Sequence, residues 1–431
     1  MLKLNNLYVG EGGQPENVIR SGGVAMPRVE YIYIDVFAGC GGLSLGLYNA
    51  GWKGLFALEK SPQAFNTLSY NLIEKKKHFK WVDWLPQKAL DINDVIANHS
   101  EQLKKLRGKI TMVVGGPPCQ GFSIAGQRNE KDERNKLIDS YIEFVNLVKP
   151  DVIFFENVKG FTMEFRNNEK KGRKYSQIVT SKLDYIGYNV HGELINFGDY
   201  GIPQKRTRFI LVGIRKDIKN SSIRKVELFF RKLEQNKFKF LNEKELPINP
   251  TIEDALSDLL SHKILVETPD RKGFESGLYN KIKSNFQRFA RKNYKEKLPN
   301  SHSFAKHTER VVERLKQVQA ATAECKNISE ELKQKLEIHT QVLVPLKANE
   351  QAPTVTSHPD DMIHYCEPRI LTVRECARLQ GFPDCFEFQN KYTTGGKLRR
   401  KEVPRYTQVG NAIPPLFGEQ AGIILKELMY D

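Results

Sequence analysis

Short apolar runs rich in β-branched and aromatic residues alternate with longer helix-compatible stretches between about residue 28 and residue 215. This alternation predicts parallel strands joined by crossover helices, because a tight turn cannot connect parallel neighbours. The predicted strands cover residues 31–37, 54–58, 110–114, 152–155 and 209–213. We therefore expect a doubly wound α/β sheet with helices on both faces over residues 28–215.

The remaining segments of the chain lack this rhythm. Residues 1–27 are polar and glycine-containing, which predicts a mobile N-terminal extension. Residues 216–404 are lysine-rich and mixed, with helix-compatible stretches at 308–323, 329–339 and 372–379, and they predict a smaller second domain. Residues 405–431 contain an apolar helix at 415–429, which we expect to return to the first domain.

The chain carries a formal net charge of +16, which favours a polyanionic partner such as nucleic acid. Between residues 271 and 316 there are 13 Lys and Arg against 4 Glu and no Asp. Lys292 and Lys295 in this run are candidate contacts to DNA phosphates. A solvated helical surface of the same composition is the alternative.

The six cysteines are scattered without a C-x-x-C pair. This spacing indicates neither a disulfide framework nor a zinc site, so we expect reduced thiols and no metal. No charged-then-apolar leader begins the chain, and no apolar run approaches the roughly 20 residues that a membrane span requires. The sequence therefore predicts a cytoplasmic protein.

A glycine-rich turn follows the first predicted strand and opens a helix. Gly39, Gly41 and Gly42 would let the backbone approach a ligand closely, although their spacing departs from the G-x-G-x-x-G fingerprint. Glu59, 20 residues after Gly39, can accept hydrogen bonds from ribose hydroxyls, and Asp91 can face an adenine amino group. A surface glutamate and a helix-capping aspartate are the alternatives. Together these residues predict an adenosine-containing ligand.

The reactive groups lie at other strand ends. Cys119 follows a buried strand on a loop stiffened by two prolines, where ligands gather in open α/β sheets. Glu156 ends the next strand, and burial would keep it protonated, as a general acid must be. Arg206 and Arg208 stand at i and i+2, where they can grip a carbonyl or a phosphate. Each residue alone would more often be structural or solvated, but together they predict covalent catalysis on a polar ring.

Six segments resemble, in order, the motifs of the DNA cytosine-C5 methyltransferases. They are residues 35–42 (DVFAGCGG), 115–123 (GGPPCQGFS), 156–158 (ENV), 204–208 (QKRTR), 374–383 (RECARLQGFP) and 408–415 (QVGNAIPP). The match runs from about residue 28 to the C-terminus, apart from a variable insertion. By this resemblance the chain is identified as a member of that family, of the bacterial restriction-modification type. The fold implied is a Rossmann-like S-adenosylmethionine methyltransferase sheet.

The resemblance implies a role for each reactive group. The Cys119 thiolate adds to C6 of the target cytosine, and Glu156 protonates N3, so that C5 becomes nucleophilic and takes the methyl group. Arg206 and Arg208 hold the cytosine and order the catalytic loop. Because C6 is inaccessible inside a stacked duplex, the base must be flipped out.

The resemblance also assigns binding residues. The cofactor, S-adenosylmethionine, leaves as S-adenosylhomocysteine, and its predicted contacts are Phe37, Gly39, Gly41, Gly42, Glu59, Asp91, Pro118 and Asn411. Gln120 and Ser123 meet the DNA, and residues 216–368 form the target-recognition region. Two features depart from the family pattern: Lys60 stands where relatives often place an apolar residue, and a basic insert occupies 397–401. The insert is either an added phosphate contact or a solvated loop.

Three other classes of protein remain as alternatives. An RNA cytosine-C5 methyltransferase would share the fold, but the Cys-Phe-Thr motif of that branch is missing and the insertion is long. A non-catalytic DNA-binding relative is disfavoured by the intact Cys119 and Glu156. A nicotinamide-dependent oxidoreductase is disfavoured by the glycine spacing. We expect a monomer that acts on double-stranded DNA, with a cognate restriction endonuclease as a functional partner.

Overall fold

The computed structural model describes residues 30–118, 136–167, 170–261, 265–394, 398 and 401–430. The predicted N-terminal extension, 1–27, lies outside these residues, as does most of the basic insert 397–401. No helix in the described part of the chain is long and apolar enough to cross a membrane.

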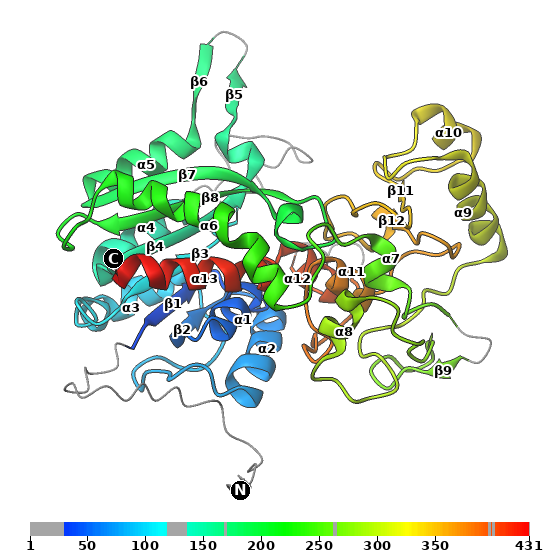
Figure 1. Cartoon of the computed structure of the whole chain (residues 1–431), viewed down its shortest axis with the longest axis horizontal. Coiled ribbons are helices and arrows are strands. Elements are labelled where there is room, and N and C mark those ends of the chain that lie inside the picture. Colours follow the sequence, from blue (N-terminus) through cyan, green and yellow to red (C-terminus); the bar gives the residue numbers. More distant parts are fainter. Residues whose placement is uncertain are drawn as a thin grey trace, which may run out of the picture. The chain divides into compact units, whose positions relative to one another are not determined.

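A six-stranded sheet, in the order β2-β1-β3-β4-β8-β7, forms the centre of the fold (Figure 1). Its strands are β1 Ile32–Val36, β2 Lys53–Leu58, β3 Met112–Gly115, β4 Val152–Val158, β7 Tyr188–Asn196 and β8 Thr207–Arg215. Strands β2, β1, β3 and β4 are parallel, whereas β8 runs antiparallel to both β4 and β7. The α/β prediction is confirmed. Edge strand β7 was not predicted, because its polar, partly exposed sequence lacks the apolar run that identified the other strands.

Helices cover both faces of the sheet, because side chains alternate along each strand. On one face Tyr33 and Met112 join a core with helices α1 (Gly42–Asn49), α6 (Ile223–Glu243) and α13 (Pro415–Tyr430). On the other, Ile34 and Val113 pack with helices α3 (Ile92–Lys104), α4 (Lys136–Val148) and α5 (Tyr175–Tyr185). The doubly wound arrangement is therefore as predicted.

Helix α6 belongs to this layered part of the fold. Its buried residues include Val226, Phe229 and Phe230, and the ring of Phe229 lies 6.5 Å from that of Phe154 on β4. The sequence-based division began the second domain at residue 216, ahead of this helix. The apolar face of α6 is buried on the sheet, so α6 packs with the predicted catalytic domain. The domain boundary at residue 216 stays a prediction.

Shorter elements make up most of the remaining chain. The described helices are α2 Pro62–Leu68, α7 Ile252–Leu256, α8 Asn285–Arg291, α9 Glu309–Ala321, α10 Glu330–Lys335, α11 Val373–Leu379 and α12 Arg405–Asn411, with a π-helix at Ser69–Lys75 and 3-10 turns at Lys159–Thr162, Phe197–Tyr200 and Pro359–Asp361. Paired short strands are β5 Glu164–Asn167 with β6 Lys170–Lys174, β9 Val266–Glu267 with β10 Glu275–Ser276, and β11 Val344–Pro345 with β12 Met362–Ile363. The helices predicted at 308–323, 372–379 and 415–429 are present, and the one predicted at 329–339 is shorter.

A buried ionic network fastens α11 to the segment that contains α7 and α8. Arg378 donates to Asp258 at 2.9 Å and to Asp384 at 2.6 Å, and all three side chains are fully buried. Arg291 at the end of α8 reaches the other oxygen of Asp258 at 3.3 Å. Buried charges are tolerated only when they are paired in this way, so the network fixes the relative placement of these segments.

Candidate active site

The residues predicted to carry chemistry meet at one edge of the sheet. In the strand register Val36 pairs with both Leu58 and Gly115, and Gly115 pairs with Phe155. The carboxyl ends of these four neighbouring parallel strands are therefore level with one another. The residues that follow them lie along the same edge of the sheet. This is the edge at which open α/β sheets bind their ligands.

Glu156 and Arg208 form an ion pair at this edge. The distance from Arg208 Nε to Glu156 Oε1 is 3.0 Å, and each side chain is 13% exposed. Burial raises the pKa of the Glu156 carboxyl above its usual value, while the positive charges of Arg208 and then Arg206 oppose that rise. The carboxyl is thus held in place by a donor and biased towards its protonated form.

The segment that leads to Cys119 leaves β3 directly against this carboxyl group. A Cβ atom added to Gly116 would lie 2.9 Å from Glu156 Oε2, so only glycine lets the backbone pass this closely. Asn157 Nδ2 donates to Pro117 O at 3.5 Å. Pro118 is the last described residue of the loop and is exposed. Cys119, Gln120 and Ser123 lie outside the described residues.

Arg206 is bound differently from Arg208. It is 2% exposed, and its guanidinium donates to Val355 O at 3.2 Å and to Gly410 O at 2.9 Å. These bonds fasten the start of β8 to two segments far along the chain. Arg206 therefore links separate segments of the fold, whereas Arg208 contacts Glu156. That both arginines hold the cytosine stays a prediction.

The glycine turn and Glu59 form a second constellation at the same edge. Glu59 Oε2 accepts from Gly39 N at 2.9 Å, and Oε1 accepts from Ser61 N at 2.7 Å. The backbone is left-handed at Phe37, Gly39 and Gly41, with φ of 62°, 57° and 92°. Burial raises the pKa of Glu59, although these backbone N–H groups oppose the rise. The glycine turn is thus joined to the end of β2 by the hydrogen bond from Gly39 N to Glu59.

Gly42 and Asn411 belong to a contact between the first helix and the C-terminal motif. A Cβ atom on Gly42 would lie 2.4 Å from Ile413 O, so this glycine is needed for close packing of α1. Asn411, at the end of α12, is exposed. The two residues lie near each other in the fold although they are 369 positions apart in the sequence.

Asp91 is engaged on both oxygens. Its Oδ1 accepts from Asn93 N at 2.9 Å and so caps α3, which was the alternative interpretation of this residue. Its Oδ2 lies 2.8 Å from Lys60 Nζ. Lys60, the residue that departs from the family pattern, is thus the ion-pair partner of a predicted cofactor contact.

Asp35, near the same edge of the sheet, is a buried acid to which the sequence assigned no role. It is 1% exposed at the end of β1 and accepts from Ser44 Oγ at 2.5 Å. Burial raises its pKa to about 7, with the Ser44 hydrogen bond opposing. The sequence feature that could have identified Asp35 is a single acid at the end of an otherwise apolar strand, with a serine nine residues later that can donate to it.

Several cations of the basic run form ion pairs. Arg310 and Arg314 both contact Glu337, and Arg291 pairs with Asp258. The predicted phosphate contacts, Lys292 and Lys295, are exposed instead. Arg310 is also 72% exposed in spite of its ion pair, whereas Arg291 is 22% exposed, so of these cations Arg291 is the least accessible to a partner.

Comparisons with known proteins identify the family. The family model of the C-5 cytosine-specific DNA methylases matches residues 31–426. Type II methyltransferase M.DdeI of Desulfomicrobium norvegicum is 30% identical over 397 residues, covering 90% of this chain and 86% of that protein. Type II methyltransferase M.XorII of Xanthomonas oryzae is 28% identical, covering 91% and 83%. The crystal structure of a DNA modification methyltransferase encoded within an Escherichia coli prophage superposes with a TM-score of 0.64 at 24% identity, covering 93% and 100%.

The sheet and its covering helices thus have the Rossmann-like α/β fold of this structural neighbour. The chain belongs to the family of C-5 cytosine-specific DNA methylases. It is a DNA (cytosine-5-)-methyltransferase, as predicted.

Proposed function

We propose that the chain transfers a methyl group from S-adenosylmethionine to C5 of a flipped-out cytosine within a specific DNA sequence. The observation that carries this proposal is the Glu156–Arg208 pair beside the loop that leads to Cys119. A carboxyl group biased towards its protonated form can donate to N3 of a cytosine, and the loop delivers the nucleophile from the adjacent strand.

The residues at the carboxyl ends of β1 and β2 fit the proposed cofactor. Phe37, Gly39 and Gly41 hold a left-handed turn, and Glu59 keeps unused acceptor capacity for ribose hydroxyls after accepting two backbone N–H groups. When bound, S-adenosylmethionine supplies an electrophilic methyl group. In the described part of the chain no group of three or more His, Cys, Asp or Glu side chains could hold a metal ion.

The chemistry follows from this chain's own residues. The Cys119 thiolate adds to C6 of the cytosine while Glu156 gives its proton to N3, and the electron density gathered at C5 takes the methyl group. The C5 proton then leaves to solvent, the Cys119–C6 bond breaks, and Glu156 takes back its proton. Arg208 keeps the carboxyl oriented throughout.

The biological role is modification of DNA within a restriction-modification system. The similar proteins of Desulfomicrobium norvegicum and Xanthomonas oryzae carry type II methyltransferase names. A cognate endonuclease would then share the recognised sequence without binding this chain. Bisulfite sequencing of host DNA that expresses the protein should reveal one methylated motif.

The covalent step is tested with duplex DNA that carries 5-fluorocytosine. Fluorine at C5 cannot leave as a proton does, so the wild-type protein should form an adduct that survives denaturation. Cys119→Ser is the matched control, which should bind DNA but form no adduct and transfer no methyl group. An active wild-type enzyme that gives no adduct would contradict covalent catalysis, and transfer to tRNA but not to duplex DNA would favour the RNA-acting alternative.

A further inference from the structure

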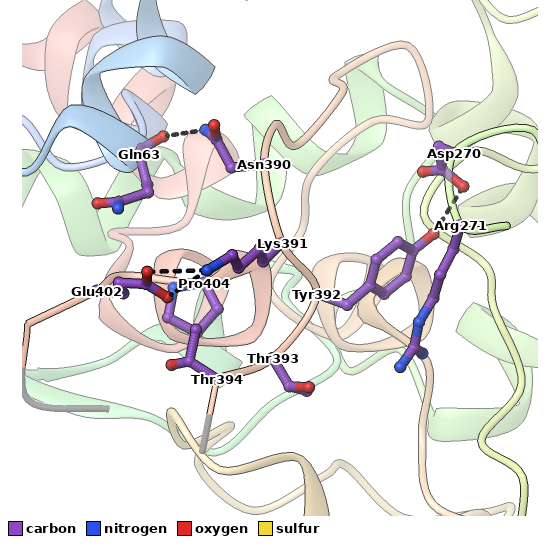
Figure 2. A pocket seen from close by; sticks show the side chains of 10 residues that line it. All are labelled: Gln63, Asp270, Arg271, Asn390, Lys391, Tyr392, Thr393, Thr394, Glu402 and Pro404. Atoms are coloured by element: carbon purple, nitrogen blue, oxygen red, sulfur yellow. Dashed lines mark hydrogen bonds and ion pairs between the residues drawn. The ribbon is translucent and has the colours of Figure 1, made fainter. Parts of the chain in front are cut away.

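A cavity of about 500 Å³ lies outside the candidate active site, since none of the residues described there lines it (Figure 2). It is lined by Gln63 of α2, by Asp270 and Arg271, by the stretch 390–394, and by Glu402 and Pro404. Gln63 follows Glu59 by four residues, which places this end of the cavity beside the carboxyl edge of β2. Of the residues that the sequence singled out, Arg271 lines it, as the first residue of the basic run 271–316.

Both acidic side chains of the cavity are already neutralised. Asp270 accepts from Tyr392 Oη at 2.8 Å and from the guanidinium of Arg405. Glu402 lies 2.9 Å from Lys391 Nζ. Figure 2 shows the Lys391–Glu402 pair on one side of the cavity and Arg271 beside Tyr392 on the other.

Arg271 is the cation that remains. Its guanidinium carbon lies 3.5 Å from the ring centre of Phe274 and 4.9 Å from that of Tyr392, so aromatic rings fix its position. Within the described residues, the hydrogen bond of its side chain goes to Ser303 Oγ, at 3.4 Å. A guanidinium has five N–H donors, so most of them are available to a ligand.

We propose that this cavity is a binding site for one backbone phosphate of the substrate DNA, with Arg271 as its ligand. The inference rests on the proposed function, since that function supplies the polyanion. The four charged side chains that line the cavity sum to zero, but Arg405, which does not line it, neutralises Asp270, so the positive charge of Arg271 is left to complement a phosphodiester. A guanidinium in contact with two rings has already lost part of its side-chain freedom, and it can offer its N–H fork to two phosphate oxygens.

The test measures binding of full-length protein to noncognate duplex DNA across a salt series. Arg271→Gln should weaken binding roughly tenfold, the loss expected for a charge-assisted hydrogen bond. It should also reduce the slope of log K against log salt by about 0.9, the value for one phosphate contact. Arg271→Lys should keep the slope, because it keeps the charge, and lose part of the affinity. The matched control is Arg107→Gln, because Arg107 is exposed on the segment before β3, at the opposite edge of the sheet.

A second measurement uses the wild-type protein and does not depend on how a variant folds. Duplex DNA should slow the reaction of Arg271 with phenylglyoxal, read by mass spectrometry, and leave that of Arg107 unchanged. An unchanged salt slope in Arg271→Gln together with a lowered melting temperature would overturn the proposal, because Arg271 would then only hold Phe274 and Tyr392. Loss of inorganic phosphate binding with an unchanged DNA slope would also overturn it in favour of a free-anion site. A wild-type protein that binds DNA but methylates none would contradict the proposed function alone.

Discussion

Arg208 Nε donates to Glu156 Oε1 across 3.0 Å, and this bond joins antiparallel strand β8 to parallel strand β4 at the catalytic edge. Two opposing effects act on the pKa of the Glu156 carboxyl group. Burial favours the protonated form that a general acid needs, and the neighbouring guanidinium favours the ionised form. Burial has the larger effect, so the pKa of Glu156 is raised, and Arg208 limits that rise while it binds the carboxyl group.

Replacing Arg208 should change the pH profile of the enzyme. Loss of its charge raises the pKa of Glu156 further, so the alkaline fall in kcat/KM should move to higher pH in Arg208→Gln, while kcat drops by roughly 100-fold through lost orientation. Arg208→Lys should restore the position of the alkaline limb more than it restores kcat. A profile that shifts to lower pH would contradict the assignment of Glu156 as the acid.

Arg206→Gln should affect stability more than pH dependence. It removes donors from two carbonyls, Val355 O and Gly410 O, and leaving buried carbonyls unpaired costs about 1–3 kcal/mol each. Urea unfolding should show that loss, while the pH at which kcat/KM falls stays closer to the wild-type value than in Arg208→Gln. Unchanged stability would show that Arg206 does not clamp these segments.

Sequence specificity should follow the insertion. Exchange of residues 216–368 with the matching segment of a relative should change the methylated sequence, because flanking bases are read by side chains in the grooves. Exchange of 251–368 alone should transfer the same specificity with less loss of stability, since it leaves α6 on the sheet. Bisulfite sequencing and thermal melting check the two statements, and a chimera that kept the original methylated sequence would contradict the first.

Lys292→Gln and Lys295→Gln should weaken binding to all DNA about equally. Each substitution that removes a phosphate-binding charge should lower the salt slope by about 0.9 while sequence preference survives. Lys216→Gln is the control. Lys216 follows the last residue of β8, at the end of the strand away from Arg208, and it pairs with Asp184. Relaxed specificity at one base pair with an unchanged slope would instead place these lysines among the base-reading residues.

Asp35→Asn should flatten the dependence of stability on pH. Asp35 has a pKa of about 7 in the folded protein against an ordinary value of 3.8, so between these values the folded state binds the extra proton. Stability from this group therefore falls as pH rises towards 7, by at most about 1.4 kcal/mol per pH unit. The free energy of unfolding, measured from pH 5 to 8, should fall less in Asp35→Asn than in the wild type. Parallel curves for the two proteins would contradict the shifted pKa.

The sequence determined the central strands, the carboxyl edge they share, and the candidates Glu156, Glu59 and the glycine turn. Each of these is encoded locally, because an apolar run predicts a buried strand and the residue after it is carried to the strand's end. The motifs that resemble the family include these same residues, so the resemblance and the strand pattern point to the same candidates.

The tertiary structure alone decided which contacts these residues make. Arg206 and Arg208 are two positions apart, yet one binds carbonyls 149 and 204 residues away and the other binds Glu156. Lys60 reaches Asp91, and Asp270 is neutralised by Arg405 so that Arg271 is left to face a cavity. Such contacts join segments that are distant in the chain, and they form because buried charges must be paired. A local sequence pattern cannot predict which distant residue supplies the pair.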